Sequence, residues 1–225
     1  MRDILKAALP QADETALDRF EIYHRLLAEW NEKMNLTAIT DPREVVEKHF
    51  ADSLAALPYL RPGMRVIDVG TGAGFPGVPL LIMEPNLELT LADSLQKRLT
   101  FLDVLLKELG LKAELVHGRA EDLGQDRRYR ERFDIALSRA VASLPVLLEL
   151  TTPFVKVGGS AIAYKGDAAE ELKSAKSAAF LLHVALRQTE LVSPLGKRCL
   201  IFADKTAPTP KTYPRKAGTP SKKPL

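Results

Sequence analysis

The stretch VIDVGTGAGFPG at residues 66–77 places four glycines directly after an apolar run. Glycine inside ordered structure costs conformational entropy, so this density indicates a place where something must approach the backbone closely. Several classes of nucleotide-like ligand bind α/β proteins at a glycine-rich turn that follows the first strand. The stretch therefore predicts a parallel sheet with a ligand at the end of its first strand.

Strand-like runs alternate with helical stretches over the middle of the chain. They fall at 65–69, 87–92, 113–117, 133–138 and 160–165. Two later runs, 183–192 and 198–203, flank the loop SPLGK and predict a closing hairpin. A leucine stripe over 94–109 that ends at Gly110 predicts the clearest of the intervening helices. This alternation implies an α/β protein with a mostly parallel sheet covered on both faces.

The first 60 residues predict a helical extension that precedes the sheet. Apolar residues at three- and four-residue steps predict one amphipathic helix over 13–34. An N-cap aspartate followed by proline predicts a second helix over 41–57, which Pro58 is expected to end. Residues 35–37 are expected to shape the turn between the two helices. We therefore predict a helical extension over 1–60 and a Rossmann-like domain over 61–204.

The C-terminal residues 205–225 carry a charge that the rest of the chain does not. They hold six of the 32 basic side chains and no acid, which leaves 26 basic against 29 acidic residues elsewhere. Five prolines and no apolar periodicity predict a loose basic arm over 205–225 that binds a polyanion. If the polyanion is RNA, the residues expected to contact it are Lys165, Lys211, Arg215, Lys216, Lys222 and Lys223. A second basic segment, 127–132, is interleaved with acids and predicts only a solvated loop.

Composition indicates the cellular compartment in which the protein is expected. The single cysteine, Cys199, excludes an intrachain disulfide, fits a reducing cytoplasm and lies in an apolar run, which predicts a buried thiol. No stretch reaches the roughly 18 apolar residues that a membrane span needs. No apolar segment typical of a secretion signal begins the chain. We expect a cytoplasmic monomer without a membrane partner.

The glycine turn by itself leaves its ligand open. Gly72 to Gly77 match the dinucleotide pattern G-x-G-x-x-G, which is weak evidence alone. Prolines 76 and 79 crowd the helix start that would hold a pyrophosphate, which favours S-adenosylmethionine instead. Gly70, Gly72 and Gly74 would face its methionine end, Asp93 its ribose, and Glu121 or the Ala120–Glu121 backbone its adenine. In the alternative reading the glycines only pack strand against helix and the acids are solvated caps.

The residues near the strand ends restrict the kind of methyl transfer. Methylation at a pyrimidine C5 needs a thiolate, and Cys199 is far from these ends in the sequence pattern. Guanine N7 already has a free lone pair and needs no general base, so it is the easiest acceptor. Ribose 2′-O methylation stays open because Lys165 could act as a base. Arg139 is expected to fix cofactor or guanine, or else to pair with Asp93 or Asp68.

Several longer motifs resemble the ribosomal RNA small subunit methyltransferase G family, also called glucose-inhibited division protein B. They include WNEKMNLTAITDP (30–42), EKHFADSL (47–54), DVGTGAGFPGVPL (68–80), LADSLQKRLTFL (91–102), HGRAEDL (117–123) and SRAVASL (138–144). The resemblance implies a class I S-adenosylmethionine-dependent methyltransferase fold, Rossmann-like, with a seven-stranded sheet, an antiparallel final hairpin and the helical extension. It also implies N7 methylation of a guanine in 16S rRNA, free or in the small ribosomal subunit.

The same motifs carry the family's cofactor contacts onto this chain. They fall on Gly70, Phe75, Asp93, Ser94, Leu95, Ala120, Glu121 and Arg139. His49 and Asp52, in EKHFADSL, lie three residues apart on one helix face. Two ligands make a poor metal site, so we expect no metal and a histidine that docks this helix onto the glycine domain. No catalytic residue is predicted.

Two other functions stay open at this point. One is a nicotinamide-dependent oxidoreductase on a similar fold, and the other is a non-catalytic RNA-binding or ribosome-assembly protein. For the loose arm, the expectation is that deletion of 205–225 weakens RNA binding and leaves cofactor affinity intact. Loss of cofactor binding would instead make the arm part of the fold.

Overall fold

A seven-stranded sheet forms the centre of the molecule in a computed structural model that describes residues 1–191 and 196–225. The strands are β1 Arg65–Val69, β2 Glu88–Asp93, β3 Glu114–His117, β4 Phe133–Arg139, β5 Val155–Lys165, β6 Val184–Leu191 and β7 Arg198–Lys205. Their order is β3-β2-β1-β4-β5-β7-β6, and β7 runs antiparallel to both β5 and β6. The predicted parallel sheet and closing hairpin are confirmed. Residues 192–195, which are the last residue of the predicted run 183–192 and the first three of the SPLGK loop, lie outside the described residues.

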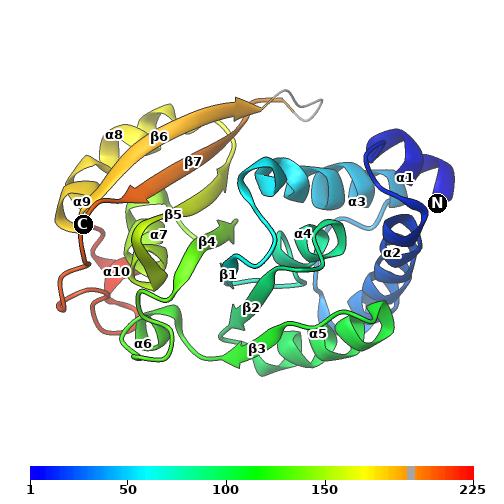
Figure 1. Cartoon of the computed structure of the whole chain (residues 1–225), viewed down its shortest axis with the longest axis horizontal. Coiled ribbons are helices and arrows are strands. Elements are labelled where there is room, and N and C mark those ends of the chain that lie inside the picture. The colour runs from blue at the N-terminus through cyan, green and yellow to red at the C-terminus, as the bar shows by residue number, and fades with distance from the viewer. Residues whose placement is uncertain (192–195) are drawn as a thin grey trace.

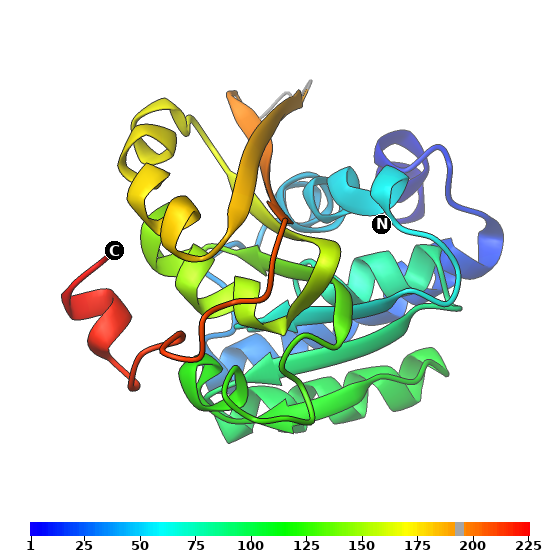
Figure 2. The same ribbon diagram turned by 60° about the vertical axis from the view of Figure 1, so that its left-hand side comes forward.

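Alternation of side chains along each strand divides the core into two layers. On β1, Val66 faces one layer and Ile67 the other, and on β7 Leu200 and Ile201 divide in the same way. One layer packs against α1 (Arg2–Ala8), α2 (Glu14–Met34), α4 (Gly77–Met83) and α5 (Gln96–Leu109). The other packs against α6 (Ala120–Leu123), α7 (Leu144–Thr151), α8 (Ala169–Ser174) and α9 (Lys176–Leu181). Figures 1 and 2 show these two groups of helices on opposite faces of the sheet.

The helical extension follows the prediction in part. Helix α2 begins after Asp13, whose carboxylate accepts the N–H of Ala16, and ends at Asn35 in the left-handed conformation. The second helix is not one regular α-helix. It begins as α3 (Pro42–Val45), continues as the π-helix η1 (Val46–Ala51) and ends as the 3₁₀-helix η2 (Leu54–Tyr59), with Pro58 inside its last turn. The wider π turn lies where this segment meets the glycine turn through His49, and such turns are frequent at functional sites.

The prediction of a loose C-terminal arm is wrong. Lys205 is the last residue of β7, and its ammonium pairs with Glu131 at 2.7 Å with none of its side chain exposed. The segment that follows packs on α6 and α7 and ends in the short helix α10 (Thr219–Lys222). Composition misled here because prolines exclude regular structure without excluding packing, and buried ion pairs leave no periodic sequence pattern.

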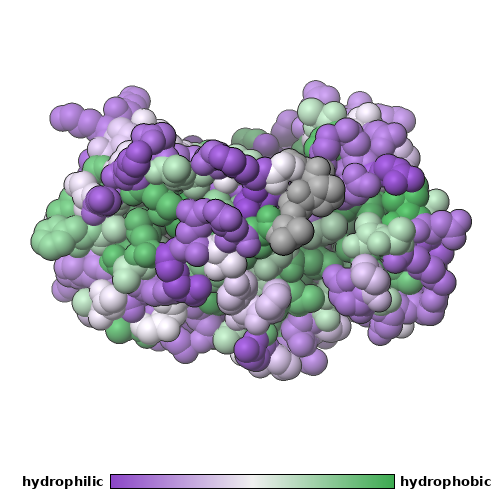
Figure 3. Space-filling model, turned by 90° about the horizontal axis from the view of Figure 1, so that it is seen from above, coloured by the Kyte–Doolittle hydropathy of each residue, from purple (hydrophilic) through white to green (hydrophobic). Residues whose placement is uncertain are grey.

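In the described part of the chain, no helix is both long and apolar enough to cross a bilayer. No three histidine, cysteine or acidic side chains of residues 1–191 and 196–225 gather as a metal centre would need. The face seen in Figure 3 alternates hydrophilic regions with small hydrophobic patches. Cys199 is buried as predicted, and its thiol donates to the Gly166 carbonyl oxygen.

Candidate active site

The glycine turn leaves β1 where the strand order reverses, between β1 and β4, which is where ligands bind in open α/β sheets. Gly70, Gly72 and Gly74 have φ of 72°, 61° and 102°, values that other residues rarely adopt. A Cβ on Gly72 would meet no atom within 4 Å, so bare backbone faces open space there. A Cβ on Gly74 would lie 2.7 Å from the Tyr23 hydroxyl oxygen. Gly74 therefore serves the packing of α2, which agrees with the alternative reading for that residue.

Asp93 at the end of β2 is tied to the glycine turn. Its side chain is almost fully buried, and it accepts the N–H of Gly72 and the N–H of Leu95, each at 2.9 Å. The Arg98 guanidinium lies 3.2 Å from the same carboxylate. A carboxylate has about four lone-pair positions, so three donors leave capacity for a ligand hydroxyl. This geometry suits the ribose contact predicted for Asp93.

A cavity of about 110 Å³ opens between the ends of the first three strands. It is lined by Val69, Gly70, Ala92, Asp93, Ser94, Gly118, Arg119, Ala120, Glu121, Val141 and Leu150. Five predicted cofactor residues are therefore brought together here: Gly70, Asp93, Ser94, Ala120 and Glu121. Val141 narrows the cavity, since its Cγ2 lies 2.8 Å from where a Cβ on Gly70 would be. This volume is smaller than the roughly 300 Å³ at the lower end of typical small-molecule pockets, so the cavity has room for only part of a nucleoside.

Leu95 and Val141 add exposed apolar surface beside this cavity. They are 41% and 39% exposed, which is unusual for large aliphatic side chains in a protein with a well-packed core. Val141 lines the cavity, and Leu95 follows the lining residue Ser94. Apolar side chains at the mouth of a site are suited to cover a flat ring such as adenine.

Asp68 provides a second test of which ligand the site fits. Its side chain is completely buried, and one oxygen accepts the Thr71 hydroxyl and the Gly77 N–H. The other oxygen, Oδ1, has no hydrogen-bond partner among the described residues. Burial raises the pKa of Asp68 to about 6. A buried carboxylate with spare capacity, together with Asp93, fits a ligand with a cationic group and hydroxyls, as S-adenosylmethionine has.

Phe75 and Arg139 lie in a separate cluster that joins the turn to the helical extension. The Phe75 ring stacks between Tyr23 and His49, with centroids 5.2 and 4.6 Å away. The Arg139 guanidinium lies 5.1 Å from the centre of the same ring. Neither Phe75 nor Arg139 lines the cavity. Their contacts with the cofactor therefore stay a prediction.

His49 docks the extension onto the glycine domain as predicted, and its neighbours determine its tautomer. Arg139 can only donate, and its Nη2 lies 3.3 Å from Nδ1, so Nδ1 accepts and the proton sits on Nε2. That Nε2 lies 2.8 Å from the Thr37 hydroxyl, in the turn predicted to join the two helices. Burial, with a further contribution from Arg139, lowers the pKa of His49 to about 4. The ring is therefore neutral in this cluster.

Asp52 is the anion that Arg139 pairs with. Both alternatives considered for this arginine, Asp93 and Asp68, are wrong as direct partners: Nη1 lies 3.1 Å from Asp52 and 3.1 Å from the Lys48 carbonyl oxygen. Arg198 from β7 binds the same carboxylate through two nitrogens at 2.8 and 2.5 Å. Asp52 thus joins the extension, β4 and β7. Nothing in the sequence pattern around Arg198 indicated this role.

The predicted RNA contacts divide into two groups. Lys165 donates to Glu171 at 2.7 Å and to the Ala142 carbonyl, and Arg215 binds the buried Glu149. Contact of either cation with RNA would require a protein ion pair to break. The remaining four are exposed on the arm: Lys211, Lys216, Lys222 and Lys223. In the segment 127–132, Arg130 is not solvated as predicted but binds carbonyl oxygens of the arm.

Comparison with known proteins agrees with this geometry. The family described as rRNA small subunit methyltransferase G matches residues 16–198. The ribosomal RNA small subunit methyltransferase G of Desulfitobacterium hafniense is 52% identical over 215 residues, 93% of this chain and 89% of the relative. Its counterpart in Streptococcus pyogenes is 48% identical, over 92% of this chain and 91% of the relative.

Solved structures share the fold at low sequence identity. A methyltransferase from Pyrococcus furiosus has a TM-score of 0.58 and 17% identity, over 84% of this chain and 98% of that one. A SAM-dependent O-methyltransferase from Thermotoga maritima has a TM-score of 0.54 and 16% identity, over 82% of this chain and 72% of that one. These similarities identify the arrangement of the sheet and its helices.

Proposed function

Because the chain belongs to the rRNA small subunit methyltransferase G family, we propose that it transfers a methyl group from S-adenosylmethionine to N7 of a guanine in 16S rRNA. Family membership carries the coarser statement: the protein is a methyltransferase of small-subunit rRNA that uses S-adenosylmethionine. The choice of guanine N7 is argued below from the chain's own residues. A nicotinamide-dependent oxidoreductase is not favoured.

The observation that carries the proposal is the cavity between the strand ends, where bare backbone at Gly70 lies beside the Asp93 carboxylate. Asp93 would accept a ribose hydroxyl, and the backbone of Ala120 and Glu121 would face the adenine. Asp68 lies under the same turn but does not line the cavity, so its carboxylate would contribute negative charge to the methionine end without touching it. The bound cofactor supplies an electrophilic methyl group on a sulfonium, and the protein's part is to orient it.

N7 is the acceptor that these residues can serve without a general base. Lys165, the candidate base for ribose methylation, shares its ammonium with Glu171. His49 is neutral, but its Nδ1 already accepts from Arg139. The Cys199 thiol is buried, and burial raises its pKa, which opposes the thiolate that a pyrimidine C5 needs. Guanine N7 carries its lone pair at neutral pH, so positioning in line with the methyl group suffices.

The four exposed lysines of the arm are the proposed phosphate contacts. They carry no counter-ion in an ion pair among the described residues, unlike Lys205 and Arg215. Backbone contacts of this kind give affinity without sequence selectivity and weaken as salt is added. We also propose that the protein acts as a cytoplasmic monomer, which light scattering after gel filtration tests for the oligomeric state.

The test is a methylation assay with labelled S-adenosylmethionine, on free 16S rRNA and on small subunits lacking the modification. Mass spectrometry of the digested rRNA is expected to find N7-methylguanosine only when the protein is present. A methylated ribose or pyrimidine would overturn the N7 assignment. Binding of rRNA without any methylation would favour the assembly-protein alternative. Thermal stabilisation by NAD but not by S-adenosylhomocysteine would overturn the cofactor.

A further inference from the structure

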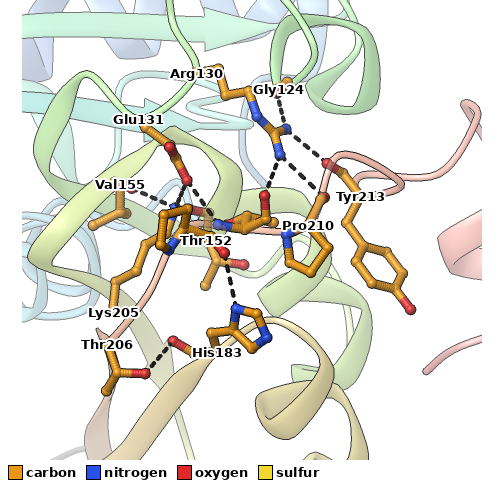
Figure 4. Close-up of polar contacts among 12 residues, drawn as sticks. Gly124, Arg130, Glu131, Thr152, Val155, His183, Lys205, Thr206, Pro210 and Tyr213 are labelled. Carbon is orange, nitrogen blue, oxygen red and sulfur yellow. Dashed lines mark hydrogen bonds and ion pairs between the residues drawn. The ribbon is translucent and has the colours of Figure 1, made fainter.

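The first half of the C-terminal arm is hydrogen-bonded to the loop that follows α6. The Arg130 guanidinium donates to the Gly124 carbonyl oxygen at 2.9 Å, and to arm carbonyl oxygens of Thr209, Pro210 and Tyr213 at 2.8, 3.2 and 2.7 Å (Figure 4). The side chain of Gln125 donates to the Pro214 carbonyl oxygen at 2.9 Å. One guanidinium therefore joins the arm to the end of α6.

The second half of the arm neutralises a buried carboxylate on α7. Glu149 has no exposed side-chain surface, and it accepts both the backbone N–H and the guanidinium of Arg215, at 2.6 to 3.2 Å. A buried charge without a partner is strongly destabilising, so this pair fixes the arm against α7. The next residue of that helix, Leu150, lines the cofactor cavity.

Glu121 receives the third contact, and it lies in the predicted adenine site. The Gly218 N–H donates to its Oε1 at 2.8 Å, and Arg119 donates to the same oxygen at 3.1 Å. Glu121 is only 3% exposed. Burial alone would raise its pKa, but the hydrogen bonds from Gly218 and Arg119 outweigh burial and lower it. Gly218 has φ of 82°, which a residue with a side chain would adopt only with strain.

We propose that the C-terminal arm supports the wall of the cofactor pocket from outside, with Gly218 as a positioning residue that holds the lining residue Glu121. The carboxylate of Glu121 is occupied by the arm and Arg119, which leaves the Ala120–Glu121 backbone to face the ligand. The inference rests on the proposed function only in taking S-adenosylmethionine as that ligand. It does not depend on which RNA atom is methylated.

The arm therefore has two roles on two sides. Its inner side holds Glu121 and Glu149, and its outer side carries Lys211, Lys216, Lys222 and Lys223. RNA bound through these lysines and cofactor bound in the pocket will each strengthen the other's binding by the same factor, because both hold the arm against Glu121. This reverses the expectation that loss of the arm spares cofactor affinity.

The experiment is a double-mutant cycle on the affinity for S-adenosylhomocysteine, measured by isothermal titration calorimetry. One change ends the chain after Lys216, which removes Gly218 but keeps Arg215 on Glu149 and the hydrogen bonds of Arg130 to the arm. The other is Glu121→Ala in the full chain. Each is expected to weaken binding about tenfold, and the two together also about tenfold, because both act through one contact.

Matched variants separate positioning from folding. Gly218→Ala in the full chain meets no steric clash and acts through its positive φ alone, so it decides the question if the shortened chain does not fold. Its cycle with Glu121→Ala is expected to be non-additive as well. Replacement of the four exposed lysines by glutamine is expected to leave the dissociation constant for S-adenosylhomocysteine unchanged.

Two outcomes would overturn the inference. One is unchanged affinity in a folded chain that lacks residues 217–225 and in Gly218→Ala. The other is an additive loss of about a hundredfold, which would mean general destabilisation. A wild-type protein that binds S-adenosylhomocysteine but methylates no rRNA would count against the proposed function alone.

Discussion

The contacts of His49 make the free energy of unfolding of this protein depend on pH. The imidazole stacks on Phe75, and its Nδ1 faces the Arg139 guanidinium, so a second proton on the ring would meet a cation in a buried place. Burial first, and then Arg139, lower its pKa from 6.5 to about 4. Between these values the unfolded chain binds a proton that the folded chain does not. Stability attributable to His49 is therefore lost as pH falls through this window.

The size of the effect follows from the two pKa values. At about pH 5 the linkage relation gives a loss of about 2 kcal/mol relative to about pH 7. Asp68 acts in the opposite direction, because burial raises its pKa from 3.8 to about 6 and the folded state takes up its proton first. The two effects partly cancel in the wild-type protein. Comparison with His49→Gln isolates the histidine, since Asp68 is present in both.

The measurement is urea unfolding of wild type and His49→Gln at both pH values. The variant is expected to be less stable near neutral pH, because it packs less well on Phe75. That deficit should shrink by about 2 kcal/mol at about pH 5. Val157→Thr, an exposed change that involves no titratable group, is the control and should keep a constant difference from wild type. A deficit of His49→Gln that does not change with pH would refute the reasoning.

Three further perturbations test other parts of the structure. Asp93→Asn removes the charge that faces the ribose position and should weaken S-adenosylhomocysteine binding about tenfold by calorimetry; unchanged affinity would remove Asp93 from the site. Asp52→Asn leaves two largely buried arginines without their anion and should lower the free energy of unfolding by about 3 kcal/mol in urea; a loss below about 1 kcal/mol would contradict the pairing. Glutamine at all four exposed lysines should reduce the slope of log affinity for rRNA against log salt by about 3, and an unchanged slope would place the RNA elsewhere.

The sequence alone was sufficient for the sheet, for helices α2 and α5 and for several residues that line the candidate cavity. Alternating side chains, leucine stripes and helix caps are local patterns, so β1 to β7, α2 and α5 followed from contiguous residues. The glycine turn and Asp93 were predictable for the same reason. They sit at the ends of successive parallel strands, and parallel strands bring their carboxyl ends to one edge.

Only the tertiary structure decided which charges bind ligands and which bind the protein. Arg139 and Arg198 meet at Asp52 across 87 and 146 positions, and Gly218 meets Glu121 across 97. Charge is counted the same way in a sequence whether a cation faces solvent or a buried carboxylate. From the sequence, all six cations of the arm were therefore predicted to be free. In the structure, Lys205 and Arg215 are neutralised by carboxylates inside the fold. Long-range ion pairs carry no periodicity, and so the packing of the chain on itself had to reveal them.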